Sequence, residues 1–310
     1  MNEYHIPVLL EQSLEGLAIK PDGIYIDTTF GGGGHAKEIL SRLDDKGHLF
    51  VFDQDEDAVA NLWEDDRMTL IISNFRYVQR WMKYYKVEGK IDGLLADLGV
   101  SSHQFGDPQR GFSYRYDEQL DMRMNRQQKL TAADILNIYS VEQLQEMFSQ
   151  YGEVTNAKTL AQQIVQARSA SPIATTGQLV SIAEAVLRGP KMQYLSKLFQ
   201  ALRIEINDEI NSLKDLLKGT EQILKPGGRA VIISYHSLED RLAKRFFKTG
   251  NFEGEHDTDF FGQRKSNWKV ITKNPVEADE EEQKINPRSR SAKMRVAERA
   301  GSREQGAGRK

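Results

Sequence analysis

Short apolar runs alternate with helix-like patterns through the first hundred residues. Three of the four apolar runs end in an acid, namely Asp27, Asp53 and Asp97. Alternation of strands and helices predicts right-handed βαβ units and a parallel sheet. The expected strands are 23–27, 48–53, 68–72 and 91–97, and the expected helices are 36–43, 58–63 and 78–85.

The pattern changes between about residues 105 and 194, where no convincing strand occurs. Ser140 and Gln143 have the spacing of a capping box, which predicts a helix to about residue 151. Two more helices are expected over 155–168 and 178–188. We interpret the segment as a helical insertion, and the expected domains are 1–108 with 197–310, and 109–196.

The main domain resumes with apolar positions at helical spacing, which predict one long amphipathic helix over 202–217. The turn 225–228, Lys-Pro-Gly-Gly, would end that helix. Strand patterns follow at 229–234, 268–272 and 293–297. The acidic stretch 277–282 is expected to be a surface loop.

Composition narrows the possible classes of protein. Of 310 residues, 39 % are hydrophobic and 28 % charged, as in globular proteins, and there is no cysteine, which excludes disulfides, zinc–thiolate sites and cysteine nucleophiles. No run is apolar enough for a membrane helix or a signal peptide, so we expect a cytoplasmic protein without a membrane partner.

The net charge of −3 conceals an asymmetry. Residues 283–310 carry nine Lys or Arg and two Glu, a local charge of +7, which leaves −10 for the rest of the chain. Such a tail can attract phosphates or can simply be solvated, and composition leaves both options open.

A glycine-rich loop follows the first expected strand. Gly31, Gly33 and Ala36 fit the pattern G-x-G-x-x-[G/A], and Asp53 closes the second strand 22 residues after Gly31. Alone, the loop could be a flexible turn and the acid a helix cap. Together they favour a ligand that carries a ribose, bound at a helix N-terminus.

NAD(P) and S-adenosylmethionine are the two candidate ligands. The turn 225–228 is similar to the one before the fifth strand of class I methyltransferases, and acids ending strands one, two and four resemble that class better than a dehydrogenase. Asp27 could then reach the amino group of the ligand, with Asp97 beside the sulfonium. We therefore favour S-adenosylmethionine.

Eight motifs in order extend this likeness over about residues 5–299. They are 5–10 (HIPVLL), 29–35 (TFGGGGH), 97–102 (DLGVSS), 110–113 (RGFS), 120–124 (LDMRM), 199–204 (FQALRI), 234–241 (SYHSLEDR) and 286–291 (NPRSRS). The succession resembles the MraW, or RsmH, family of 16S ribosomal RNA (cytosine-N4)-methyltransferases. The resemblance implies a Rossmann-like class I methyltransferase fold of α/β type, with a mostly parallel sheet and an inserted all-helical domain that recognises RNA.

The resemblance also implies the reaction and its site. A methyl group would pass from S-adenosylmethionine to a cytidine of 16S ribosomal RNA near the P site of the small subunit. The implied cofactor-binding residues are Asp27, Gly31, Gly33, Gly34, His35, Asp53, Phe75, Asp97 and Gln104. Phe75 could equally be plain core packing, and His35 a helix-start residue that touches no ligand.

The expected catalytic residues lie after strands four and five, namely Asp97, Ser101, Ser102 and His236. A hydrogen-bond acceptor is needed because the cytosine amine is a poor nucleophile. The chain lacks the Asp/Asn/Ser-Pro-Pro-Tyr/Phe motif of many amino-methyltransferases, so Asp97 could instead bind only the cofactor. No metal is expected.

Basic and aromatic residues are expected to contact the RNA, namely Arg110, Phe112, Tyr114, Arg123, Arg203, Ser237, Arg288, Arg290 and Arg295. The alternatives are aromatics that pack inside the insertion, and Ser237 as a helix cap. Two other functions stay open. One is a ribosome assembly factor with a vestigial methyltransferase fold, and the other is a methyltransferase for another class of substrate. A homodimer is a possible assembly.

Overall fold

The structure is a computed structural model that describes residues 7–256 and 266–301, except for the side chains of Ser102 and His103. The chain divides into two compact units. One comprises Met1–Gly99 and Asn211–Lys310, and the other comprises Val100–Ile210. The range of the second unit is wider on both sides than the range 109–196 expected from the sequence. Residues 5 and 6 of the first motif and 302–310 of the basic tail lie outside the described residues.

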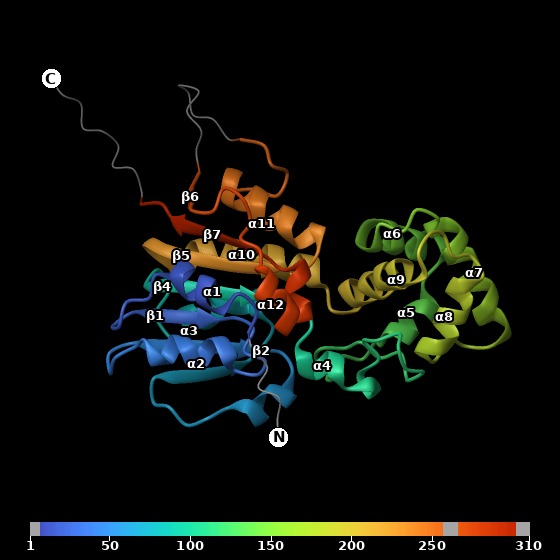
Figure 1. Ribbon diagram of the computed structural model, residues 1–310, viewed down its shortest axis with the longest axis horizontal. Helices are drawn as coiled ribbons and strands as arrows, with labels where there is room; N and C mark the ends of the chain where they lie inside the picture. Colours follow the sequence, from blue (N-terminus) through green and yellow to red (C-terminus); the bar gives the residue numbers. More distant parts are fainter. Residues whose placement is uncertain (1–6, 257–265, 302–310) are drawn as a thin grey trace. The chain divides into compact units, whose positions relative to one another are not determined.

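The first unit is built on a seven-stranded sheet of order β3-β2-β1-β4-β5-β7-β6 (Figure 1). The first five strands in that order run parallel, and β7 and β6 are antiparallel additions at one edge. The mostly parallel Rossmann-like sheet is therefore confirmed. The strands are β1 (Ile24–Asp27), β2 (His48–Asp53), β3 (Met68–Ile72), β4 (Ile91–Asp97), β5 (Leu224–Ser234), β6 (Trp268–Val270) and β7 (Lys293–Arg299).

Both faces of the central strands are buried, as continuous apolar runs require. In β4, Leu94 packs with one hydrophobic cluster and Leu95 with the other, on opposite faces of the sheet. The helices of this unit are α1 (Leu10–Leu17), α2 (Gly34–Ser41), α3 (Val78–Tyr84), α11 (Ser237–Thr249), α12 (Glu280–Ile285) and α10 (Glu209–Ile223), whose first two residues belong to the second unit. Because β1, β2 and β4 are neighbours, their terminal acids meet at one edge of the sheet.

The predicted turn 225–228 is a bulge at the start of β5. Leu224 pairs with Ile91 and Arg229 with Gly93, so four residues of β5 stand opposite Asp92. Gly227 in this bulge has φ 80°, which favours glycine. The regular ladder begins at Arg229, where the strand was predicted to start.

Three predicted elements were wrong in detail. The single helix over 202–217 is interrupted, because Asp208 adopts φ 48° between α9 (Lys191–Ile206) and α10. The acidic loop 277–282 is partly helix α12, whose first turn is capped by Asp279. The predicted helix 58–63 is a 3₁₀ segment, Glu56–Asn61.

The second unit is helical, as predicted, and contains only one isolated β-bridge among its described residues. Its helices are α4 (Ser102–Gly106), α5 (Ala132–Ile138), α6 (Val141–Gly152), α7 (Ala157–Ala170), α8 (Thr176–Glu184) and α9 (Figure 1). The capping box of Ser140 and Gln143 is confirmed, and Thr131 and Thr175 form two more. Its core includes Leu136, Phe148 and Leu198, all fully buried. In the described part of the chain, no helix is long and apolar enough to cross a membrane.

Candidate cofactor and active site

The loop between β1 and α2 requires its glycines. Gly31 and Gly33 have φ of 50° and 75°, which side chains other than glycine rarely adopt. A Cβ on Gly33 would lie 2.7 Å from the Trp63 ring, and one on Gly34 would collide with the ring of Pro7. The loop is therefore a fixed backbone surface at the N-terminus of α2, and a flexible turn does not describe it.

Asp53 is bonded to this loop. Its Oδ2 accepts a hydrogen bond of 2.9 Å from the Gly31 amide, and its Oδ1 accepts one of 2.9 Å from the Asp55 amide. The side-chain amide of Asn61 donates to the Gly31 carbonyl at 2.9 Å. Burial raises the pKa of Asp53 to about 6. The two features that the sequence predicted as one site are thus joined directly.

Asp27 keeps one carboxylate oxygen without a partner. Its Oδ1 accepts hydrogen bonds from the amide and the hydroxyl of Thr29, at 3.0 and 3.3 Å. Its Oδ2 is buried with no hydrogen-bond partner, and burial raises the pKa of Asp27 to about 6. A buried carboxylate oxygen left open in this way is suited to a cationic group.

Asp97 is held from two sides. Its Oδ1 accepts a hydrogen bond of 2.7 Å from the Tyr235 hydroxyl, and its amide donates to Thr29 Oγ1 at 2.8 Å. Burial raises the pKa of Asp97 to about 6, while the Tyr235 hydrogen bond and the positive charge of Arg288 oppose that rise. Burial and the Asp97 charge raise the pKa of Tyr235 well above its usual value.

Tyr235 is a functional candidate that the sequence prediction missed. It stands inside the motif 234–241, but nothing in the pattern of residues pointed to its hydroxyl. Its ring also lies 3.4 Å from the position of a Cβ on Gly99, whose φ is 97°. The signal available beforehand was only its place directly after β5, next to β4 in the sheet.

The side chain of His35 contacts the protein backbone inside the core. Its Nε2 lies 3.2 Å from the Val8 carbonyl oxygen inside the core, and burial lowers the pKa of the ring. Its backbone lies in the first turn of α2. Phe75 opens a 3₁₀ turn after β3 and is half-buried against the hydrophobic cluster of that face.

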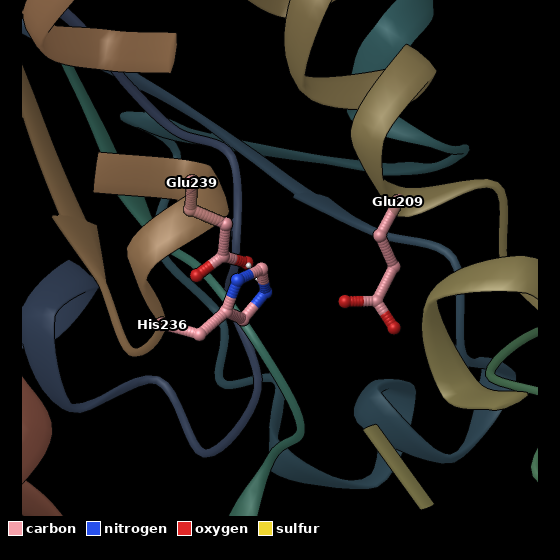
Figure 2. Close-up of side chains that lie close together, drawn as sticks. All are labelled: Glu209, His236 and Glu239. Atoms are coloured by element: carbon pink, nitrogen blue, oxygen red, sulfur yellow. Dashed lines mark ion pairs between the residues drawn. The ribbon is translucent and has the colours of Figure 1, made fainter. Parts of the chain in front are cut away.

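His236 precedes α11 and lies beside Glu239 (Figure 2). Its Nε2 is 3.2 Å from Glu239 Oε1, and Glu239 Oε2 accepts a hydrogen bond from the Tyr235 amide at 3.0 Å. His236 occupies the N-cap position of α11, so Ser237 is the first helical residue and not the cap. Ser237 is exposed.

Arg295 does not fit the predicted role of a phosphate contact. Its guanidinium makes two hydrogen bonds to the Asp240 carboxylate, at 2.6 and 3.0 Å, and the side chain is 7 % exposed. Arg288 and Arg290 lie in the 3₁₀ segment Pro287–Ser291, where Arg290 is exposed.

Three predicted RNA contacts of the second unit are likewise engaged in the scaffold. Arg110 is buried and donates to the carbonyl oxygens of Arg123 and Met124, at 2.9 and 3.3 Å. Arg123 forms a paired contact with Asp121, and Arg203 forms one with Glu209. These guanidinium groups make their hydrogen bonds inside the unit, which argues against their serving as phosphate contacts.

The predicted aromatic contacts differ from each other. Phe112 is 6 % exposed and belongs to the core of the second unit, so it offers no stacking face. The Tyr114 hydroxyl is 3.0 Å from Ser196 Oγ, and its ring packs edge-on against Phe199.

The side chain of Gln104, predicted to bind the cofactor, is buried in the same unit. Its Oε1 accepts a hydrogen bond from the Ser101 amide at 3.1 Å.

Comparison with known proteins decides the family. The model of the MraW methylase family matches residues 2–300. The chain belongs to the MraW methylase family. Its relatives include proteins named ribosomal RNA small subunit methyltransferase H from Parabacteroides distasonis, 52 % identical over 96 % of this chain and 97 % of the relative, and from Amoebophilus asiaticus, 56 % identical over 96 % of each. An rRNA methylase from Streptococcus thermophilus of known structure is 11 % identical, with a TM-score of 0.40, covering 96 % and 99 % of the two chains.

Membership of the MraW methylase family confirms three expectations from the sequence. They are the family itself, the enzyme class of methyltransferase, and the cofactor S-adenosylmethionine. The dehydrogenase alternative is thereby excluded.

Proposed function

We propose that this chain transfers a methyl group from S-adenosylmethionine to the exocyclic N4 amine of a cytidine in 16S ribosomal RNA, near the P site of the small subunit. The names of the relatives support an RNA of the small subunit as the substrate. The observation that carries the proposal is the Asp97 carboxylate, bonded to Tyr235 at the strand edge that also holds the glycine loop.

The residues present fit the cofactor. S-adenosylmethionine carries an ammonium and a sulfonium, and the buried Asp27 Oδ2 is open for a cation. Asp53 has further lone pairs for ribose hydroxyls besides those used by the Gly31 and Asp55 amides. Phe75 would pack on the adenine ring. When bound, the cofactor supplies a methyl group that its sulfonium has already activated.

Asp97 would act on the acceptor amine. The lone pair of a cytosine amine is delocalised into the ring, so an acceptor for the amine protons would concentrate electron density on nitrogen and later take a proton. With a pKa of about 6, the carboxylate is mainly ionised above pH 7 and can accept a hydrogen bond. Since Oδ1 is bonded to Tyr235, Oδ2 is the oxygen that would face the amine.

Three further residues stay in the catalytic proposal. His236, which follows Tyr235 in the sequence and lies 3.2 Å from Glu239, would assist removal of the proton from the methylated amine. Ser101 and Ser102, which follow β4 in the sequence, would hold the base. Gln104 would assist cofactor binding in the same segment.

The target base must leave its stack to reach a buried carboxylate. We keep Tyr114, Ser237, Arg288 and Arg290 as proposed RNA contacts, and the second unit as the proposed recognition unit. Association with the small subunit and a cytoplasmic location follow from that substrate. Whether the enzyme works as a homodimer can be measured separately.

Transfer of a labelled methyl group tests the proposal. Purified protein and methyl-labelled S-adenosylmethionine are incubated with unmodified 30S subunits, naked 16S ribosomal RNA, protein extract or DNA. We expect label in the RNA, and N4-methylcytidine after digestion to nucleosides. Label in protein or DNA would indicate another substrate class, and cofactor binding without any incorporation would indicate an assembly factor.

A further inference from the structure

The exposed face of α11 carries only positive charge. Arg241, Lys244, Arg245 and Lys248 follow the spacing i, i+3, i+4 and i+7, which places them on one face of the helix. All four are exposed. The helix lies in a chain with a net charge of −3, so this concentration of positive charge does not reflect a general excess of Lys and Arg.

The acids of α11 are engaged elsewhere. Glu239 accepts a hydrogen bond from the Tyr235 amide, and Asp240 pairs with Arg295 of β7. Ala243, Phe246 and Phe247 are buried and hold the helix against the sheet. Both acids of the helix therefore make contacts away from its exposed face.

Two lysines of α10 extend the positive surface around Phe252, which follows α11. The ammonium groups of Lys214 and Lys218 lie 5.9 and 5.6 Å from the centre of the Phe252 ring. Arg245 donates to the Phe252 carbonyl oxygen at 3.2 Å. A hollow of about 410 Å³ beside this ring is also lined by Glu221 and Glu253, so the helix face attracts anions better than the hollow does.

We infer that the α11 surface, defined as Arg241, Lys244, Arg245 and Lys248 with Lys214 and Lys218, binds the phosphate backbone of ribosomal RNA. The inference rests on the proposed function. Helix α11 starts two residues after Tyr235, whose hydroxyl holds Asp97, and its 13 residues extend the surface about 20 Å from that point. A strand whose base reaches Asp97 would have its flanking phosphates within reach of this face.

Phosphate binding by lysine has a measurable signature. Each cation that neutralises a phosphate of a single strand releases counterions and contributes about 0.7 to the slope of log affinity against log salt. Loss of two such contacts should lower the slope by about 1.4 and weaken binding by roughly tenfold near 0.1 M salt.

The test compares two double variants of equal charge. Lys244→Gln with Lys248→Gln removes two exposed charges of the α11 surface. The control, Lys46→Gln with Lys90→Gln, removes two exposed charges from the turns before β2 and β4, which contribute no residue to the α11 surface. Affinity for 16S ribosomal RNA, its salt dependence, cofactor affinity and thermal stability are measured for both and for the unaltered protein.

We expect only the α11 variant to lose RNA affinity and slope, with cofactor affinity and stability unchanged in both. Equal RNA affinity for the two variants would overturn the inference while leaving the proposed function intact. So would a variant that loses binding to vesicles of anionic lipid but keeps its RNA affinity. If the unaltered protein transfers no methyl group to RNA, the proposed function itself fails.

Discussion

The Tyr235 hydroxyl donates a hydrogen bond of 2.7 Å to Oδ1 of Asp97. The two residues lie at the ends of adjacent strands, since Asp97 ends β4 and Tyr235 directly follows β5. The bond fixes the orientation of the carboxylate and favours its ionised form against the effect of burial. Tyr235 is therefore a positioning residue that acts through Asp97.

Replacement of this phenol tests its influence on Asp97. In Tyr235→Phe the carboxylate loses a donor that lowers its pKa, so the acidic limb of the pH profile of kcat should move to higher pH. Loss of orientation should also lower kcat at pH 7 by about tenfold. Methyl-transfer rates at a series of pH values measure both effects.

Tyr25→Phe is the matched control, because it removes a buried hydroxyl near the start of β1 that accepts a hydrogen bond from the Lys20 amide. Its acidic limb should stay in place even if its stability falls. An unchanged limb in Tyr235→Phe would contradict the role assigned to Tyr235.

Asp53 offers a test of the cofactor site. Asp53→Ala removes the acceptor proposed for the ribose and frees the Gly31 amide, so cofactor affinity should fall roughly ten- to a hundredfold. RNA affinity should be unaffected. Equilibrium dialysis with labelled cofactor measures the first quantity, and Asp53→Asn, which keeps one acceptor oxygen, should fall between the two proteins. Unaltered cofactor affinity would refute the assignment of Asp53.

The charge of Asp27 should lower the stability of the cofactor-free protein at neutral pH, although the same charge favours cofactor binding. Because burial raises its pKa from 3.8 to about 6, its contribution to folding is fully present below about pH 4 and is lost as the pH rises through 6. Asp27→Asn removes the buried charge, so without cofactor it should be more stable than the parent at pH 7.5, by about 1–2 kcal/mol. The advantage should vanish near pH 4. Urea unfolding at both values measures it, and a less stable variant at pH 7.5 would contradict the account.

Arg295 and Arg290 should behave differently. Arg295→Ala leaves Asp240 without its partner in a nearly buried pair and should cost about 3 kcal/mol of unfolding free energy. Arg290→Ala changes an exposed side chain and should cost less than about 0.5 kcal/mol. The denaturation curves of the two variants should thus have clearly different midpoints. Coincident midpoints would show that the pair of Arg295 with Asp240 does not contribute to the unfolding free energy.

Much of the sheet could be predicted because its signal is local. β2, β3 and β4 begin and end at the predicted residues, since each is a mainly apolar run with a clear boundary. The break before α10 could not be predicted, because the apolar spacing continues across it. It depends on a tertiary contact, in which the Asn207 side chain bonds to the backbone of Met122 and Met124.

The candidate site shows the same division. Asp27, Asp53 and Asp97 were predictable because each closes a strand, and parallel strands bring their ends to one edge. The partnership of Tyr235 with Asp97 was not, since it joins residues 138 positions apart. Nor was the burial of Arg295, because the sequence does not tell which arginine meets an acid across the fold.

Calorimetric titration of the purified protein with S-adenosylmethionine tests the central claim most directly. The account predicts one bound cofactor per chain at pH 7.5. It also predicts weaker binding at pH 5.5, where Asp27 and Asp53, with pKa of about 6, become protonated and hold the cation and the ribose hydroxyls less well. An absence of binding heat across temperatures, or equal affinity at both pH values, would contradict it.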